Sequence, residues 1–301
     1  MDIRHQSDTK QQVDEVVSAV ALSRKYRTLC TDTIRRIAER ELATVPHGSV
    51  RGAVKATKRR LHQIYGAFER DFDYAAAYQR LQAAYQTGSD AEIRAACRHV
   101  LGLHSSARER LPILDRFFPA IFEVTGRPSS ILDLGCGLNP LALPWMGLLP
   151  RQGSQGSYGS EQFVPQRGSG QAAKARYVAL DIDADRIGFL NRYLTLAGLE
   201  PLAHCQDLLV HPPDDAVDVA LLLKMSPSLE RQEPGTTLRL IEHLRAPFVV
   251  VSFAVKSLGG REKGMVEHYQ RQFLELAEDR KWPVEKLGFE TELVFVVKRN
   301  A

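Results

Sequence analysis

Apolar residues recur every three to four positions along the first 125 residues, in segments rich in Ala, Leu and Arg. That spacing places apolar side chains on one face of an α-helix. It predicts helices over residues 11–22, 31–43, 50–68, 74–86, 90–101 and 105–124. We therefore expect the chain to begin with an all-α domain, which we assign to residues 1–110.

After Pro128 the pattern changes to short apolar, β-branched runs that alternate with helical segments. The runs are SSILDLG, RYVALDID, PLAHCQDL, VDVALLLK, PFVVVSFA, VEKLGF and TELVFVVK. Helices are predicted between them at residues 141–149, 185–199, 228–244 and 265–280. Such alternation is typical of parallel βαβ units with helices on both faces. The last two runs are too close together for a crossover helix, so they predict an antiparallel hairpin. Residues 111–301 are therefore expected to form a mostly parallel, seven-stranded, Rossmann-like α/β domain, which resembles the class I methyltransferase fold.

Residues 151–175 interrupt this alternation. They hold five Gly, four Ser and five Gln with few apolar residues. This composition predicts a flexible surface insertion in the α/β domain.

The overall composition, 44% hydrophobic and 25% charged, is typical of a globular protein and excludes a disordered or fibrous chain. The apolar runs at 217–223 and 246–255, which include Asp218 and Ser252, are shorter than the roughly 20 residues of a membrane span. The first residues lack the apolar core of a signal peptide, so we expect a cytoplasmic protein. The four cysteines lack zinc-ligand spacing, which predicts reduced, mostly buried thiols and no metal site.

Basic residues are concentrated near the N-terminus. Residues 1–110 hold 19 Lys and Arg against 13 Asp and Glu, a net charge of +6, whereas the remainder carries −2. Residues 23–62 alone have 11 basic and three acidic residues. A concentrated excess of this kind favours a face that binds a polyanion such as nucleic acid. The candidate RNA-binding residues here are Arg24, Lys25, Arg59 and Arg60.

The sequence DLGCGLNP, residues 133–140, ends the first strand and leads into a helix. Gly135 and Gly137 permit a sharp turn and leave space for a ligand against the backbone. Asn139 suits the N-cap of that helix. A dinucleotide fingerprint needs a third glycine where Pro140 stands, so a bridging pyrophosphate is not indicated. DxGxG at this place is instead the first motif of enzymes that bind S-adenosylmethionine (SAM).

Acidic residues end the next two strands. Because strand ends converge beside the ligand crevice of a doubly wound sheet, Asp181 is expected to accept both ribose hydroxyls. Asp183 is better placed to cap the following helix. At the third strand, Asp207 is expected to accept the adenine amino group while Leu208 packs on the ring.

Two motifs that are typical of other nucleic-acid methyltransferases are absent from the sequence, which narrows the choice of methyl acceptor. Enzymes that methylate exocyclic amines commonly carry [DN]PP[YF] after the fourth strand, where this chain has KMSP. No cysteine stands where a base C5 methyltransferase needs its nucleophile. An acceptor that is already nucleophilic, such as guanine N7, fits best, since its lone pair needs alignment and no proton removal. We therefore assign no catalytic general base.

Two further segments are candidates for binding. The Gly-rich segment after the fifth strand carries Lys256, Arg261 and Lys263, which are expected to contact a phosphate backbone. The segment LHSSARERL, residues 103–111, places two hydroxyls and two arginines at the domain junction.

Four blocks, SRKYRTLCTDTIRR, LHSSARERL, DLGCGLNPLALPW and VSFAVKSLGGREKGM, closely resemble the aminoglycoside-resistance 16S rRNA methyltransferases that modify N7 of guanine 1405. The resemblance spans nearly the whole chain. It implies a helical N-terminal domain that docks on the 30S subunit, a SAM-binding C-terminal domain, and resistance to 4,6-disubstituted deoxystreptamine aminoglycosides. The insertion at 151–175 departs from the compact family members.

The resemblance also implies a set of cofactor contacts. Arg110 would pair with the methionine carboxylate, Gly135 would offer its backbone, and Asp181, Asp207 and Leu208 would act as above. The remaining residues expected around the cofactor are Phe68, His104, Ser105, Ser106, Leu223 and Gln232.

Two alternatives remain at this point. One is a catalytically silent 30S-binding or assembly factor that keeps the fold, and intact Gly135, Gly137, Asp181 and Asp207 argue against it. The other is a small-molecule methyltransferase, which the basic N-terminal segment disfavours.

Overall fold

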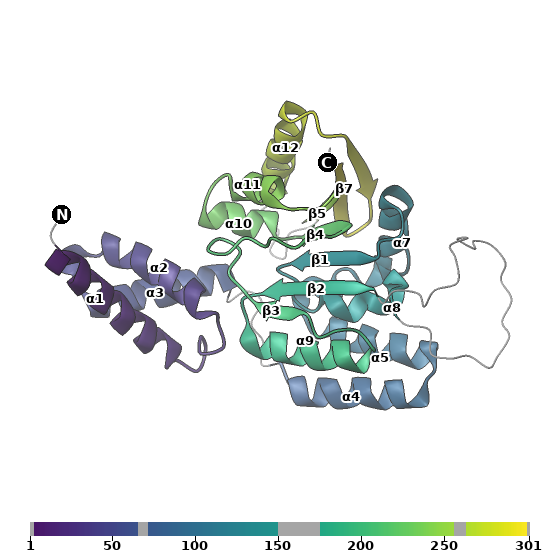
Figure 1. Cartoon of the computed structure of the whole chain (residues 1–301), viewed down its shortest axis with the longest axis horizontal. Helices are drawn as coiled ribbons and strands as arrows, with labels where there is room; N and C mark the ends of the chain where they lie inside the picture. The colour runs from purple at the N-terminus through teal and green to yellow at the C-terminus, as the bar shows by residue number, and fades with distance from the viewer. Residues whose placement is uncertain (1–2, 66–71, 150–174, 256–262, 300–301) are drawn as a thin grey trace, which may run out of the picture.

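A computed structural model of the chain describes residues 3–65, 72–149, 175–255 and 263–299. Seven strands form one sheet in the order β3-β2-β1-β4-β5-β7-β6 (Figure 1). Their bounds are β1 Ser130–Leu134, β2 Arg176–Asp181, β3 Ala203–Cys205, β4 Val219–Leu223, β5 Phe248–Ala254, β6 Val284–Gly288 and β7 Glu292–Lys298. Strands β1 to β5 pair in parallel, whereas β7 is antiparallel to both β5 and β6. The predicted closing hairpin is confirmed.

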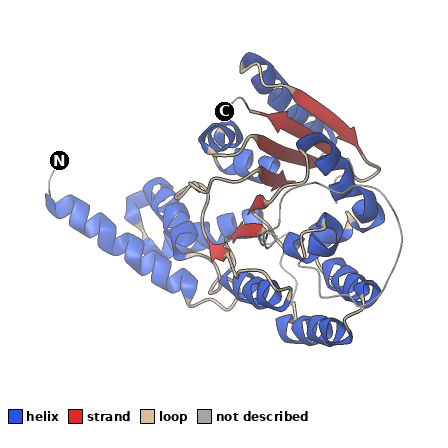
Figure 2. Cartoon of the chain, turned by 45° about the vertical axis from the view of Figure 1, so that its right-hand side comes forward, coloured by secondary structure: helices blue, strands red, loops and turns tan. Residues whose placement is uncertain are grey.

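The sheet is covered by helices on both faces, as Figure 2 shows. Alternate residues of β1 divide between the faces. Ile131 belongs to the apolar core that includes residues of α4, α5, α7 and α9, and Leu132 belongs to the core that includes residues of α11 and α12. These helices are α4 Tyr74–Thr87, α5 Asp90–Gly102, α7 Leu114–Thr125, α9 Ala184–Leu196, α11 Thr236–His243 and α12 Lys263–Asp279. Strands buried on both faces read as continuous apolar runs, which explains why β4 is VALLL.

Two predicted helices are interrupted. Residues 105–124 form α6 Ser105–Arg108, a 3₁₀ turn at Leu111–Ile113 and then α7, because Pro112 suits only the start of a helical turn. Residues 228–244 divide into α10 Ser226–Gln232 and α11, with Gly235 between them at a φ of +78°. The predicted helix at 141–149 is a 3₁₀ turn, Asn139–Ala142, followed by the short α8, Leu143–Met146.

Helices α1 Ile3–Ala21, α2 Thr31–Thr44 and α3 Val50–Tyr65 precede these elements and share a separate apolar core. In Figure 1 they lie beside the ends toward which β1 and β2 point. Helices α4 and α5 instead share their core with the sheet. The helices before residue 111 are thus in two groups, and the domain boundary at residue 110 stays a prediction.

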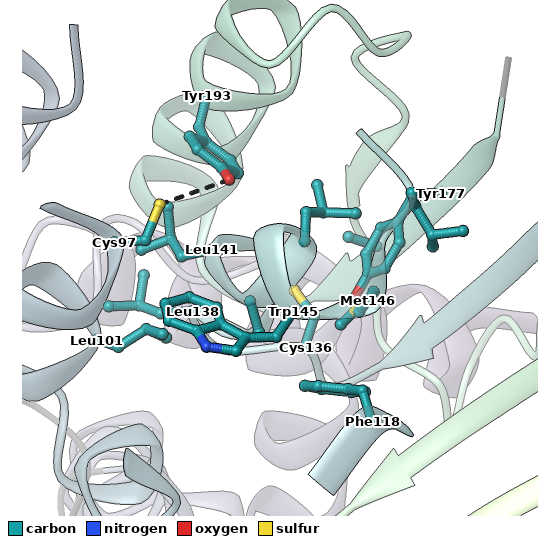
Figure 3. Close-up of a cluster of buried hydrophobic side chains, with 14 of the residues drawn as sticks. Cys97, Leu101, Phe118, Cys136, Leu138, Leu141, Trp145, Met146, Tyr177 and Tyr193 are labelled. Atoms are coloured by element: carbon teal, nitrogen blue, oxygen red, sulfur yellow. Dashed lines mark hydrogen bonds between the residues drawn. The ribbon is translucent and has the colours of Figure 1, made fainter. Parts of the chain in front are cut away.

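A buried cluster supports the turn that follows β1 (Figure 3). Leu138, Leu141 and Trp145, from the turn and α8, pack against Leu101 of α5. The Cys97 thiol of α5 lies 3.7 Å from the Tyr193 hydroxyl of α9 in the same cluster. This packing holds the glycine turn in place against α5.

The cysteines correct one expectation. Cys30, immediately before α2, and Cys205, at the end of β3, form a disulfide between residues 175 positions apart. Cys97 and Cys136 are free and buried, as predicted. The pairing depends on how α2 docks against β3, which the linear spacing of cysteines does not reveal.

Candidate functional site

The turn after β1 depends on two glycines in left-handed conformation. Gly135 has a φ of +64° and Gly137 a φ of +54°. A Cβ atom on Gly135 would collide with the side chain of Met225. The turn therefore brings bare backbone against the space between β1 and β4, as the DxGxG motif predicts.

Asn139 has a different role from the predicted helix cap. Its amide nitrogen donates to Asp133 Oδ2 at 2.9 Å, and its Oδ1 accepts from Arg110 Nη1 at 2.9 Å. Tyr177 of β2 also donates to Asp133 Oδ2, at 2.6 Å. Burial raises the pKa of Asp133 to about 6, although the hydrogen bonds from Tyr177 and Asn139 lower it. The side chain of Asn139 thus joins the glycine turn to Arg110, and the short turn Asn139–Ala142 begins without a side-chain cap.

Arg110 is held by Glu292, the first residue of β7. Its Nε and Nη2 donate to the two carboxylate oxygens of Glu292 at 3.0 and 2.7 Å. Burial raises the pKa of Glu292, but the charges of Arg110 and Lys224 outweigh it and hold this pKa below the ordinary value. The guanidinium is therefore fixed in place before any ligand binds.

Lys224, immediately after β4, belongs to the same buried group. Its Nζ donates to the Ser106 carbonyl at 2.6 Å and to Glu109 Oε2 at 3.0 Å. Burial lowers the pKa of Lys224, with Arg110 adding to the effect and the two carboxylates opposing it. The residue has a φ of +60°, a strained conformation for a residue other than glycine. It ties the segment around Ser106 to the end of β4.

Asp181 and Asp183 lie at the end of β2 and have separate roles. Asp181 accepts hydrogen bonds from the Gly137 backbone at 2.9 Å and from Arg186 Nη1 at 2.8 Å. Asp183 caps α9 by accepting from the Arg186 backbone at 3.0 Å, and its carboxylate also accepts from the Tyr65 hydroxyl. The predicted cap is confirmed.

Asp207 follows β3 and is almost completely buried. Its Oδ1 accepts from the Leu209 backbone at 2.9 Å, and its Oδ2 accepts from Arg36 Nε at 3.0 Å. Arg36 comes from α2, and its Nη2 also donates to Gln232 Oε1 at 2.9 Å. A residue of the N-terminal helices thus reaches the pocket formed by β3 and α10.

One cavity collects nine of the eleven residues predicted around the cofactor, namely His104, Ser106, Arg110, Gly135, Asp181, Asp207, Leu208, Leu223 and Gln232. Ser105 lines a neighbouring cavity that shares His104 and Arg186 with it. Burial lowers the pKa of His104 to about 4, so the imidazole is neutral at pH 7. Phe68 lies outside the described residues.

The predicted RNA-binding residues are placed differently from one another. Arg24 and Lys25 are exposed and line the mouth of the neighbouring cavity, and Arg59 is exposed on α3. Arg60 is half-buried and donates to the Arg231 carbonyl at 3.0 Å, so it contacts α10. Lys256 and Arg261 lie outside the described residues. Lys263 begins α12, and its side chain is not among those described.

Four residues of the cavity region were not predicted as site residues from the sequence, although three of them lie in segments quoted above: Arg36, Tyr65, Lys224 and Glu292. Arg36 stands in a helix with five other charged residues, so its charge alone does not single it out. Glu292 begins an apolar strand run and carries no motif of its own. Only the pairing of distant elements reveals their position.

A SAM molecule fits the chemistry of this cavity. At Gly137 the turn leaves open space, since the nearest neighbour of a Cβ there would be His104 at 3.8 Å. Asp181 and Asp207 supply buried acceptors at two strand ends, and Arg110 supplies a fixed cation. With the mostly parallel sheet and its closing hairpin, these features define a class I SAM-dependent methyltransferase.

The comparisons with known proteins give the family. The model of the family described as "Ribosomal RNA methyltransferase (FmrO)" matches residues 22–166 and 163–296. The chain belongs to this family of ribosomal RNA methyltransferases.

Relatives and solved structures agree with this assignment. A 16S rRNA (guanine(1405)-N(7))-methyltransferase of Micromonospora echinospora is 40% identical over 295 residues, 97% of this chain and 99% of the relative. One of Serratia marcescens is 33% identical over 289 residues, 96% of this chain and 99% of the relative. The crystal structure of the 16S rRNA methyltransferase RmtF with S-adenosyl-L-homocysteine is 29% identical, with a TM-score of 0.73 and coverage of 100% of both chains.

None of the helices in residues 3–65, 72–149, 175–255 and 263–299 is long and apolar enough to cross a membrane. Within the same ranges, no group of three or more His, Cys, Asp or Glu side chains is arranged to hold a metal ion.

Proposed function

We propose that this protein transfers a methyl group from SAM to N7 of guanine 1405 in 16S rRNA of the 30S subunit. The observation that carries the proposal is the single cavity in which nine predicted cofactor residues meet. The names of full-length relatives at 33% to 40% identity support the target. Bound SAM supplies an electrophilic methyl group on a sulfonium sulfur.

Three groups of residues would bind the three parts of the cofactor: its methionine, its ribose and its adenine. Arg110, fixed by Glu292, would bind the methionine carboxylate, with the Gly135 backbone beside it. Asp181 would bind the ribose. Asp207 and Leu208 would hold the adenine, and the remaining contacts would come from Phe68, His104, Ser105, Ser106, Leu223 and Gln232.

Methylation at N7 places few chemical demands on the protein. The attacking group is a lone pair in the plane of the base, so no proton has to leave before the carbon–nitrogen bond forms. Alignment of the base with the methyl group and exclusion of water then account for the rate. Neutral His104 adds no positive charge next to the cofactor.

The first helices supply the docking surface in this proposal. Residues 1–110 are inferred to act as an all-α domain whose basic face binds the 16S rRNA backbone. Arg24, Lys25 and Arg59 are exposed on it, and Arg60 lies at its border with α10. Lys256, Arg261 and Lys263, in the segment that follows β5 in sequence, are assigned to a second contact.

The test is methyl transfer to isolated 30S subunits with radiolabelled SAM, followed by mapping of the modified nucleotide by reverse transcription after cleavage at N7-methylguanine. The proposal expects one modified base, guanine 1405. Label at another nucleotide would change the target. Binding of 30S subunits and SAM without label transfer would favour the catalytically silent factor.

A further inference from the structure

Arg36 is the one cation among the residues of α1 to α3 that line the cofactor cavity, the others being Thr33, Ile64 and Tyr65. Its guanidinium bridges two side chains that belong to different elements, Asp207 after β3 and Gln232 at the end of α10. Arg36 Nε lies 3.0 Å from Asp207 Oδ2, and Arg36 Nη2 lies 2.9 Å from the same oxygen. Arg36 itself lines the cavity together with these partners.

The bridge fixes the direction of the Asp207 carboxylate. The side chain of Asp207 is 4% exposed, and that of Arg36 is 22% exposed. A buried carboxylate requires a compensating charge, and here Arg36 provides it while the Leu209 backbone holds the other oxygen. The carboxylate is thus held from two sides. Its remaining lone pairs are available to a donor in the cavity.

The Gln232 amide is oriented by the same residue. Its Oε1 accepts from Arg36, and its Nε2 donates to the Ser228 carbonyl at 3.3 Å. Swapping the amide oxygen and nitrogen would bring Nε2 against the guanidinium, where neither group accepts a hydrogen bond. Arg36 therefore sets the polarity of two groups that face the same part of the cavity.

We propose that Arg36 is a positioning residue of the adenine subsite, so that α2 determines how the cofactor's base is recognised. This inference rests on the proposed function, because it takes Asp207 as the acceptor of the adenine amino group. By holding Asp207 as an acceptor, Arg36 makes the subsite select an amino group at position 6 of the purine over a carbonyl oxygen.

Arg40 offers a matched control on the same helix, one turn further along. Its Nη1 donates to the Gln232 backbone carbonyl at 2.8 Å, so it also joins α2 to α10. Arg40 makes no contact with Asp207 among its described hydrogen bonds and does not line the cavity. A residue that merely docks the helices should behave like Arg40.

The experiment compares two ligands by isothermal titration calorimetry. S-adenosylhomocysteine carries the 6-amino group, and S-inosylhomocysteine carries a carbonyl oxygen at the same place. The proteins are the wild type, Arg36→Gln, Arg36→Lys and Arg40→Gln, each as the full chain. The ratio of the two dissociation constants within one protein does not depend on how much of that preparation is folded.

We expect the wild type to prefer S-adenosylhomocysteine by about tenfold or more, the effect of one charged hydrogen bond. Arg36→Gln should bind it about 10 to 100 times more weakly and prefer it by less than about threefold. Arg36→Lys should recover part of the preference, since an ammonium supplies the charge without the planar fork. Arg40→Gln should keep the wild-type preference.

Other results overturn the proposal. A wild-type preference retained in Arg36→Gln, or an equal loss in Arg40→Gln, would show that Arg36 only docks the helices. A wild type that binds neither ligand would overturn the proposed function itself. A wild type that binds both equally would remove Asp207 as the acceptor, and the assignment of Arg36 with it.

Discussion

The guanidinium of Arg110 and the carboxylate of Glu292 form a buried, two-pronged ion pair between residues 182 positions apart in the sequence. The pair connects the segment after α6 to the first residue of β7, the second strand of the C-terminal hairpin. Asn139 joins it to the glycine turn, and Lys224 lies 3.8 Å from the same carboxylate. One carboxylate therefore organises two cations beside the cofactor cavity.

Replacing this carboxylate should destabilise the protein. Glu292→Gln leaves Arg110 and Lys224 buried without their shared counter-charge, and breaking a buried pair in this way costs about 3 kcal/mol. Urea unfolding followed by circular dichroism measures the loss. Glu290→Gln is the control, because Glu290 is exposed and pairs with Arg116 at the surface, and its curve should match the wild type. Equal curves for both variants would show that the Glu292 pair contributes nothing to stability.

Asp181→Asn should weaken SAM binding. It should also lower stability, because Asp181 is the buried partner of Arg186, so circular dichroism first checks that the variant is folded. The amide keeps the size of the side chain but weakens its acceptor role toward the ribose, which is worth about 1.5 to 3 kcal/mol. Asp185→Asn, exposed in the first turn of α9, is the control and should bind SAM normally. Calorimetric titration with SAM measures both. A wild-type dissociation constant for Asp181→Asn would remove Asp181 from the site.

Charge reversal on the exposed basic face should weaken binding to the 30S subunit. Arg24→Glu with Arg59→Glu changes residues that lie on the surface of the first helices, whereas Arg60 contacts α10 and is left intact. Phosphate contacts release counterions, so wild-type affinity should fall steeply with salt and the variant should show a smaller slope. Arg80→Glu, exposed on α4, is the control. Wild-type affinity that does not respond to salt would refute the docking face.

Acid stability should depend on His104. Burial lowers its pKa from 6.5 to about 4, so between these values the unfolded chain binds a proton that the folded chain does not. Its stabilising effect is therefore complete above pH 6.5 and is lost as the pH falls to 4, by on the order of 3 kcal/mol. His104→Asn should lose less stability over this range in urea titrations at each pH.

The pKa of Asp133 acts in the opposite direction in the same range. It is raised from 3.8 to about 6, so its contribution is largest below 3.8 and declines as the pH rises to 6. Asp133 is present in both proteins, and the difference between them isolates His104. If the free energy of unfolding changes with pH in the same way in the wild type and in His104→Asn, then His104 is not the source of the acid sensitivity.

Expression in a susceptible bacterium should give resistance to gentamicin and kanamycin but not to neomycin. Methylation of N7 removes a hydrogen-bond acceptor and leaves a fixed positive charge on the guanine. A cationic drug at about 4 Å, with an effective dielectric constant near 20, is then repelled by up to about 4 kcal/mol, roughly a thousandfold in affinity. Minimum inhibitory concentrations measure this, with Asp181→Asn as the inactive control. Equal protection against neomycin would indicate a different nucleotide.

Local pattern was sufficient for the strands, the glycine turn and the acids at strand ends, because each depends on neighbours in sequence. The positions of Asp181 and Asp207 follow from where an apolar run stops, and β6 and β7 follow from a short connection. Partners far apart in sequence were not accessible in this way. The contacts of Arg36 and Glu292 and the Cys30–Cys205 bond each depend on which elements meet after folding. Asn139 does not cap the helix because its side chain binds Asp133 and Arg110 instead.

The contacts of α2 have a consequence for how such a protein can be recombined. Cys30 is bonded to the end of β3, the Cys30 backbone donates to Ile182 at 2.8 Å, and Arg36 reaches Asp207. A crossover between α3 and α4 that exchanged the first helices for those of another RNA-binding protein would sever every one of these links. The first three helices are therefore not a portable targeting tag. These helices and the sheet have to be exchanged together, because a chimaera needs an α2 and a β3 segment that fit each other to bind the cofactor.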